Sequence, residues 1–180
     1  MALAEGTAGG FAGVYKVLKE LEDRGHVRRG YFIEGLGAAQ FGLAGAVDRL
    51  RDHKPAEAES QADSEVVTLA AVDPAQPYGA AISWPQVEGR PSRSAGAYMI
   101  LADGEPLCYL ERGGKSIVVF DRGRQDSRWM DELKALVNSG RASRLEVRTI
   151  NSKPHGDEPE IKAKMLENGF SAGYRGLTFS

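Results

Sequence analysis

The first 55 residues carry hydrophobic positions at two different spacings. Val14, Leu18 and Leu21 recur at the three- and four-residue intervals of an amphipathic helix, and Gly25 follows where such a helix would end. After that helix, the apolar and glycine positions predict a strand, a turn, a second strand and a short helix, at 27–33, 35–37, 39–41 and 44–51. A helix, a β-hairpin and a helix in this order make up the last two-thirds of a winged helix.

We expect the first piece not to be stable alone, because one helix and a wing cannot form the three-helix core of a winged helix. We therefore expect residues 1–54 to be the C-terminal part of a winged-helix domain, cut within the domain. The segment 55–64 has no large apolar residue and is acidic, so we interpret it as a linker. The remaining residues, 65–180, form the second predicted domain.

The second piece alternates between short apolar stretches and turn residues. Residues 66–72 form an apolar stretch, and strands are predicted at 98–101, 107–110, 117–120 and 145–147, with helices at about 126–138 and 161–168. Residues 174–179 close the chain, and Asp103-Gly104 is a typical hairpin turn between the first two of these strands. The predicted fold class is α+β: the partial winged helix, followed by a small antiparallel β-barrel-like domain with two helices.

Composition and charge narrow the class of protein. The chain has 180 residues, 42 % of them hydrophobic and 27 % charged, as in a soluble globular protein, and no apolar run is long enough to span a membrane. The beginning of the sequence does not resemble a signal peptide, and the single cysteine, Cys108, fits a reducing cytoplasm. Cysteine and histidine show no metal-ligand spacing, so no metal site is predicted.

Two glycine motifs resemble nucleotide-binding sequences, but each lacks features that nucleotide binding requires. Gly114-Lys115-Ser116 resembles the end of a phosphate-binding P-loop, but Tyr109 stands where that loop needs its first glycine, and a β-branched strand follows in place of a helix. The turn at 35–40 lies between two strands, and Gln40 replaces the last glycine of a dinucleotide fingerprint. We predict no cofactor, ATP included, for this chain.

Basic residues give the most useful chemical signal, although the net charge of −2 is not that of a dedicated nucleic-acid binder. In a winged helix, a recognition helix and the base of a wing are where lysine and arginine meet DNA phosphates. Basic residues near the turns of the second domain are further candidates. The predicted DNA-binding residues are Lys16, Lys19, Arg28, Arg29, Arg112 and Lys115.

An alternative interpretation treats these side chains as structural. Arg28 and Arg29 would then be solvated strand residues paired with Glu20 or Glu22. Trp84 and Tyr98 are available for base stacking, but aromatic residues beside strands are more often part of a core.

No pair of residues is spaced for catalysis. Asp73, Glu111 and Asp121 lie at strand ends, where acidic residues usually cap turns.

The amino-acid sequence of several stretches resembles the C-terminal region of large helicase-related (Lhr) proteins. The similar stretches are 9–15, 28–41, 45–51, 71–81 and 174–179, in the expected order and across nearly the whole chain. This resemblance implies a superfamily 2 helicase that moves along single-stranded DNA with ATP and takes part in DNA repair. ATP and Mg²⁺ would then belong to motor domains outside this chain.

The same resemblance implies that the C-terminal extension is similar to winged-helix DNA glycosylases with a β-barrel, and that it takes part in oligomerisation. The glutamine-centred motif of those glycosylases is not recognisable here, and no catalytic residue is transferred. The expected partners are DNA, in particular single strands, the remainder of the helicase chain and a second copy of the protein, with no membrane partner.

Three hypotheses follow for the function. The first, which we favour, is a module without catalytic activity that binds DNA or organises oligomers of a helicase. The second is a glycosylase-like enzyme, in which Asp73 would activate water against a flipped base. The third is a protein-interaction domain whose arginines serve protein partners.

Overall fold

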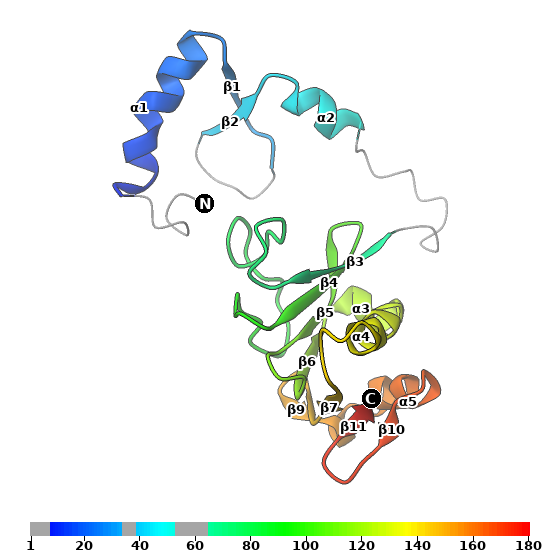
Figure 1. Ribbon diagram of the computed structural model, residues 1–180. Coiled ribbons are helices and arrows are strands. Elements are labelled where there is room, and N and C mark those ends of the chain that lie inside the picture. Colours follow the sequence, from blue (N-terminus) through cyan, green and yellow to red (C-terminus); the bar gives the residue numbers. More distant parts are fainter. Residues whose placement is uncertain (1–7, 34–38, 53–64) are drawn as a thin grey trace. The chain divides into compact units, whose positions relative to one another are not determined.

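The computed structural model describes residues 8–33, 39–52 and 65–180 (Figure 1). The chain folds into two compact units: residues 1–59 with 78–83, and residues 60–77 with 84–180. These are the N-terminal unit and the C-terminal unit. The predicted linker, 55–64, and most of the wing turn lie outside the described residues.

The N-terminal unit contains two helices and a hairpin. Its elements are α1 (Gly10–Asp23), β1 (Val27–Gly30), β2 (Gln40–Leu43) and α2 (Ala46–Asp52). The two strands pair antiparallel, with Val27 opposite Leu43. The predicted helix, hairpin and helix are therefore confirmed, and α1 ends at the glycine turn that the sequence indicated, where His26 N–H donates to the Leu21 carbonyl at 2.9 Å.

Gln40 holds the base of the wing together. Its Oε1 accepts hydrogen bonds from the backbone N–H groups of Phe32 and Ile33, at 2.8 and 2.9 Å, and its Nε2 donates to the Ile33 carbonyl at 2.9 Å. These bonds continue the β1–β2 ladder beyond its last strand pair. Tyr15 of α1 packs edge-on against Phe41 of β2, with ring centroids 6.0 Å apart, so the helix lies against the hairpin.

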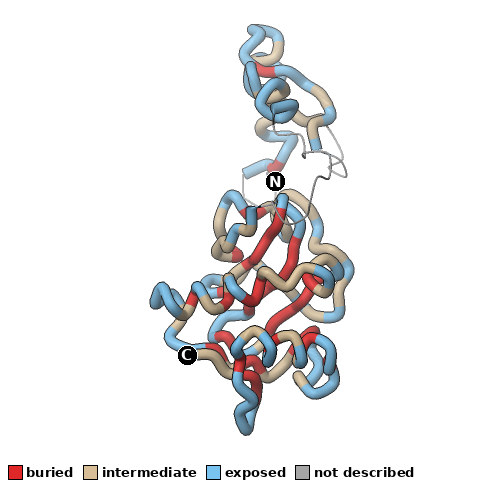
Figure 2. The backbone as a smooth tube through the Cα atoms, turned by 90° about the vertical axis from the view of Figure 1, so that its right-hand side faces the viewer, coloured by how far each residue is buried: buried red, intermediate tan, exposed pale blue. Residues whose placement is uncertain are grey.

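The described part of the N-terminal unit has little core. Val27, 7 % exposed, is its buried hydrophobic side chain, and Val14, Leu18 and Leu21 are half-buried. Val17, Leu43 and Leu50 are each more than half exposed. Figure 2 accordingly shows buried backbone concentrated in the strands of the C-terminal unit.

The C-terminal unit is built on a six-stranded sheet in the order β3-β4-β5-β6-β8-β9. Its strands are β3 (Val66–Ala70), β4 (Tyr98–Ala102), β5 (Glu105–Leu110), β6 (Ser116–Val119), β8 (Thr149–Ile150) and β9 (Lys153–Pro154). Neighbouring strands are antiparallel except for the parallel pair β6–β8. A smaller sheet has the order β10-β11-β7, from β10 (Ser171–Ala172), β11 (Leu177–Phe179) and β7 (Leu145–Val147).

The α+β class is confirmed, but the described strands form no closed barrel. A barrel requires the first and last strands to pair, whereas β3 and β9 are the two edges of the large sheet. The chain leaves β6 through helices before it returns as β8, which makes that pair parallel and ends the meander that the sequence suggested.

Three α-helices follow in the C-terminal unit where two were predicted. They are α3 (Asp121–Gln125), α4 (Trp129–Asn138) and α5 (Pro159–Glu167), with a short 3₁₀ helix, η1 (His155–Asp157). The sequence missed α3 because it is short and carries Gly123 in its middle. A Cβ on that glycine would lie 2.1 Å from the Leu107 carbonyl oxygen, so only glycine lets α3 approach β5.

One hydrophobic core joins the two sheets and the helices of this unit. Trp129, Leu133 and Leu136 of α4 are buried in it, as the periodicity predicted, and the Trp129 indole N–H donates to the Gly123 carbonyl at 2.8 Å. Met165 of α5 and Leu177 of β11 are also buried there. No helix in the described part of the chain is long and apolar enough to cross a membrane.

Candidate nucleic-acid interface and pocket

The predicted DNA-binding residues of α1 lie on its solvent face. Lys16 and Lys19 are exposed, on the side of the helix opposite the half-buried Val14, Leu18 and Leu21. Neither lysine forms a hydrogen bond or ion pair with another described residue, so both ammonium groups are available to an anionic partner.

The two adjacent arginines of β1 have different surroundings. Arg29 donates from Nη1 to the Tyr15 hydroxyl at 3.3 Å, and its Nε lies 3.4 Å from Glu22 Oε1, so it faces α1. Arg28 is exposed and, because successive strand residues project to opposite faces, points away from that contact. Arg28 forms no ion pair within the described segments. Of the two arginines, Arg29 matches the structural interpretation and Arg28 keeps its charge available.

Of the basic residues near the turns of the C-terminal unit, four arginines are engaged inside the fold. Arg93 donates to the carbonyls of Gln76, Val72 and Asp73 at 2.5–3.1 Å. The others bind acidic side chains: Arg122 binds Asp103 and Glu105, Arg124 binds Glu158, and Arg128 binds Asp126. These four guanidinium groups stabilise turns and helix junctions.

Arg112 and Lys115 lie in the turn between β5 and β6, and both are exposed. Neither forms an ion pair with a described residue. Ser116 begins β6, so the turn leads into a strand and not into the helix that a P-loop requires.

The aromatic candidates belong to the packing of the C-terminal unit. Trp84 packs edge-on against Tyr109, with ring centroids 6.0 Å apart. Tyr98 packs against the core from β4, and Phe120 is buried. Asp73 is half-buried, and its Oδ1 accepts a hydrogen bond from the Ala75 N–H at 2.8 Å, which caps the turn after β3.

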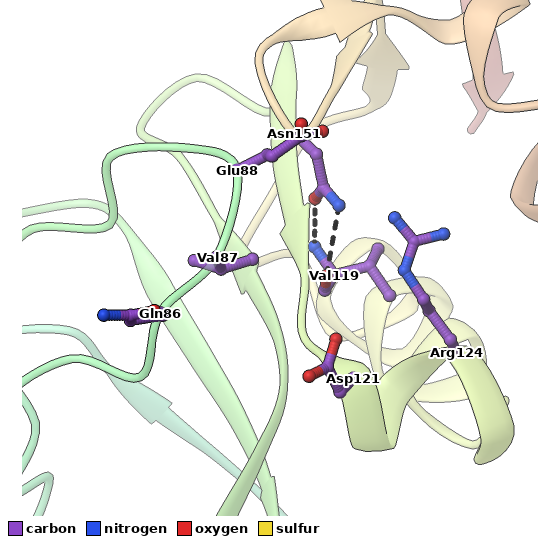
Figure 3. A pocket seen from close by; sticks show the side chains of 7 residues that line it. All are labelled: Gln86, Val87, Glu88, Val119, Asp121, Arg124 and Asn151. Atoms are coloured by element: carbon purple, nitrogen blue, oxygen red, sulfur yellow. Dashed lines mark hydrogen bonds between the residues drawn. The ribbon is translucent and has the colours of Figure 1, made fainter.

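A pocket of about 580 Å³ lies beside β6 and α3 (Figure 3). Its lining residues are Gln86, Val87, Glu88, Val119, Asp121, Arg124 and Asn151. Residues 86–88 form one wall, and the Asp121 carboxylate points toward the space between this wall and β6. Asp121 forms no hydrogen bond or ion pair with a described residue.

Asn151, Arg124 and Glu88, which also line the pocket, are engaged in hydrogen bonds. Asn151 accepts from the Val119 N–H at 2.7 Å and donates to the Val119 carbonyl at 3.2 Å, so its buried amide takes the place of a strand partner at the C-terminal end of β6. Hydrogen bonds to Glu158, at 3.1 and 3.3 Å, raise the pKa of the Arg124 guanidinium. A hydrogen bond from Lys153 lowers the pKa of Glu88.

Local sequence signals for this pocket are weak. Asp121 was recognisable as an acidic residue at a strand end, but Asn151 and residues 86–88 carry no motif. Asn151 lies beside β6 because β6 and β8 are parallel neighbours, a pairing that local periodicity does not encode. No group of three or more His, Cys, Asp or Glu residues that could hold a metal occurs in the described ranges.

Comparison with known proteins gives two concordant results. Residues 1–62 match the family model for the winged-helix domain of large helicase-related proteins. The chain is 43 % identical over 184 residues to a Mycolicibacterium smegmatis protein named Lhr helicase/probable uracil glycosylase. It is 33 % identical over 180 residues to an Escherichia coli protein named Lhr helicase/uracil glycosylase.

Each alignment covers 97 % of this chain and 12 % of the relative. The chain thus spans about an eighth of the length of these relatives, and its N-terminal part is a winged-helix domain. The resemblance that the sequence suggested is confirmed: the chain is similar over nearly its whole length to large helicase-related (Lhr) proteins, and its N-terminal part matches their winged-helix domain.

Proposed function

We propose that this chain is a non-motor module of an Lhr helicase and binds DNA through the phosphate backbone, with Lys16, Lys19 and Arg28 as contacts in the N-terminal unit. The observation that carries the proposal is the combination of a winged-helix domain with these three exposed cations, none of them neutralised by a described acid. In winged helices, phosphate contacts position the protein, and lysine and arginine supply them.

The test is fluorescence-anisotropy binding to single-stranded and duplex oligonucleotides over a range of salt. Lys16→Ala with Arg28→Ala should weaken binding and make the salt dependence shallower, by about 0.9 in slope per lost contact on duplex and about 0.7 on single strands. Arg29→Ala should weaken binding less, because Arg29 is held by Glu22 and Tyr15.

A matched control removes the same charge from other positions of the unit. Arg24 and Arg51 are exposed but lie beside Glu20 and Asp48, at 3.9 and 3.5 Å. Arg24→Ala with Arg51→Ala should leave binding nearly unchanged. Equal losses in the two double variants would mean that only net charge matters, which contradicts the proposed contacts.

The remainder of the helicase chain is the proposed partner of the exposed apolar side chains Val17, Leu43 and Leu50. Each is more than half exposed in the N-terminal unit, and exposed apolar residues that together form one patch mark an interaction site. Measurement of the mass in solution tests a second copy as the partner: a dimer whose mass falls to the monomer in Leu43→Ser would assign this surface to self-association.

Base excision is a second candidate function, supported by the names of both relatives and by the pocket beside β6. A flipped uracil would enter the pocket, and Asp121 would accept a proton from water as the water oxygen bonds to C1′. The C1′–N1 bond breaks and uracil leaves as its anion.

Release of uracil from a single-stranded oligonucleotide tests this candidate and separates two carboxylates. Asp121→Asn should abolish release, whereas Asp73→Asn and the exposed control Asp157→Asn should retain it. Loss in Asp73→Asn alone would assign the chemistry to the residue that the sequence suggested. No release by the unaltered chain would remove this function.

A further inference from the structure

The turn between β10 and β11 presents a fully exposed aromatic side chain. Tyr174 is 102 % exposed, the highest value among the exposed large hydrophobic residues described, and Arg175 beside it is also exposed. The turn protrudes from the smaller sheet at the red end of the chain in Figure 1. Tyrosine in a folded domain normally buries most of its ring, whereas the ring of Tyr174 is fully available to a partner.

The turn is held in a defined position. The Gly173 N–H donates to the Gly176 carbonyl at 2.8 Å, which closes the turn around Tyr174 and Arg175. Gly176 lies so close to β7 that a Cβ would be 2.4 Å from the Val147 carbonyl oxygen and 3.1 Å from the Arg148 nitrogen. A larger residue at 176 would push the turn away from the sheet. The tyrosine is therefore displayed from a fixed support.

Cationic residues lie around the base of the β10–β11 turn. The Arg148 N–H, beside Gly176, donates to the Lys115 carbonyl at 2.8 Å, so the β5–β6 turn and the β10–β11 turn flank the same residue. Lys115 and Arg175 are exposed and form no ion pair with a described residue. Glu146, the acidic residue within β7, is already paired with Arg144 and Arg148, at 3.3 and 2.8 Å. The local charge is positive in a chain whose net charge is −2.

We infer that the β10–β11 turn of the C-terminal unit is a second contact for single-stranded DNA, in which Tyr174 stacks on a base and Lys115 and Arg175 bind the flanking phosphates. A ring displayed among cations matches a nucleotide, which offers an aromatic face and a negative charge. Duplex DNA fits less well, because its bases are already stacked on one another. This second contact rests on the DNA binding proposed above. It lies in the other unit and uses none of the N-terminal contacts Lys16, Lys19 and Arg28.

The test compares three substitutions at Tyr174 in the full chain, with anisotropy on a single-stranded oligonucleotide. Tyr174→Ala should weaken binding by about 5- to 150-fold, the loss of one stacked base. Tyr174→Phe should bind like the unaltered protein, whereas Tyr174→Leu, which is apolar without a ring, should behave like alanine. Duplex affinity should change far less than single-strand affinity in all three variants.

The charges are tested separately. Lys115→Ala with Arg175→Ala should reduce the single-strand salt slope by about 1.4. Arg90→Ala with Arg141→Ala removes two exposed cations elsewhere in the same unit and should leave the slope unchanged. Because the Tyr174 side chain is fully exposed, thermal unfolding of its variants should match the unaltered chain, which excludes misfolding as the cause.

Three outcomes would overturn the inference: single-strand affinity that is unchanged in Tyr174→Ala, full binding by Tyr174→Leu, or a Tyr174 effect confined to the mass in solution. The last would identify a protein contact. Failure of the winged-helix proposal is distinguishable, because the Lys16 and Arg28 variants would then bind normally while the Tyr174 variants remain weakened.

Discussion

At the scale of residues, Asn151 couples the candidate pocket to the stability of the C-terminal unit. It is buried, has a positive φ of 52°, and its side-chain amide satisfies both backbone groups of Val119. Asparagine tolerates this backbone conformation better than most residues do, and its amide can both donate and accept. Asparagine therefore suits both the positive φ at position 151 and the hydrogen bonds to the Val119 backbone.

Asn151→Ala is expected to lower the free energy of unfolding by about 2–4 kcal/mol, because two buried backbone groups lose their partners. Asn151→Gly should be less damaging by about 1 kcal/mol, since glycine removes the strain of the positive φ. Urea unfolding measures both changes. Ser152→Ala, at an exposed neighbour with φ 65°, is the control for backbone strain alone; an equal loss there would contradict the assigned hydrogen bonds.

Cys108 should be inert in the folded protein. It is fully buried in the core, and burial raises the pKa of its thiol far above the usual range. The thiolate that reacts with disulfide reagents is therefore scarce and inaccessible. A thiol titration should detect no fast-reacting group under native conditions and one group per chain in denaturant. Rapid labelling of the native protein would show that the core opens easily.

At the scale of elements, the entry into α4 depends on an ion pair. Asp126 accepts hydrogen bonds from the backbone and side chain of Arg128 at 2.6–3.2 Å, and the side-chain bonds lower the pKa of its carboxyl below the ordinary value of 3.8. Because the folded-state pKa is the lower one, this contribution is complete above pH 3.8 and is lost as the pH falls through the folded value.

Asp126→Asn should therefore destabilise the C-terminal unit by about 1 kcal/mol at neutral pH, and the difference from the unaltered protein should disappear in acid. Chemical denaturation at a series of pH values measures this. Asp131→Asn on α4, whose carboxylate is mostly exposed, should show little effect at either pH. If the difference in stability between Asp126→Asn and the unaltered chain grew in acid, folding would not lower the pKa of Asp126, which contradicts the assigned ion pair.

Local sequence patterns located most elements but not their assembly. The spacing of Val14, Leu18 and Leu21 identified α1, and Asp103-Gly104 identified the β4–β5 hairpin, because both signals are local. The open sheet, the β6–β8 pairing and α3 depend on contacts between distant segments. Among the candidate site residues, the exposure of the lysines was predictable, whereas the pairing of Arg29, the pocket around Asn151 and the setting of Tyr174 required the tertiary structure.

At the scale of the whole molecule, the two units should differ in stability. The C-terminal unit contains an extensive buried core, whereas the described part of the N-terminal unit buries Val27 and little else that is hydrophobic. Hydrogen exchange should therefore be faster in α1 than in β4 and β5, by at least about tenfold. Equal protection of the two units would indicate that α1 gains a partner in solution, and dilution would then show whether that partner is a second copy.

DNA binding by the unaltered chain is tested most directly by its salt dependence. Anisotropy with a labelled single strand and a labelled duplex should show affinity that falls linearly with salt on logarithmic axes, with a slope of about −2 or steeper, as expected for three or more phosphate contacts. Absence of binding to either oligonucleotide at low salt would contradict the central claim that this module of an Lhr protein contacts DNA.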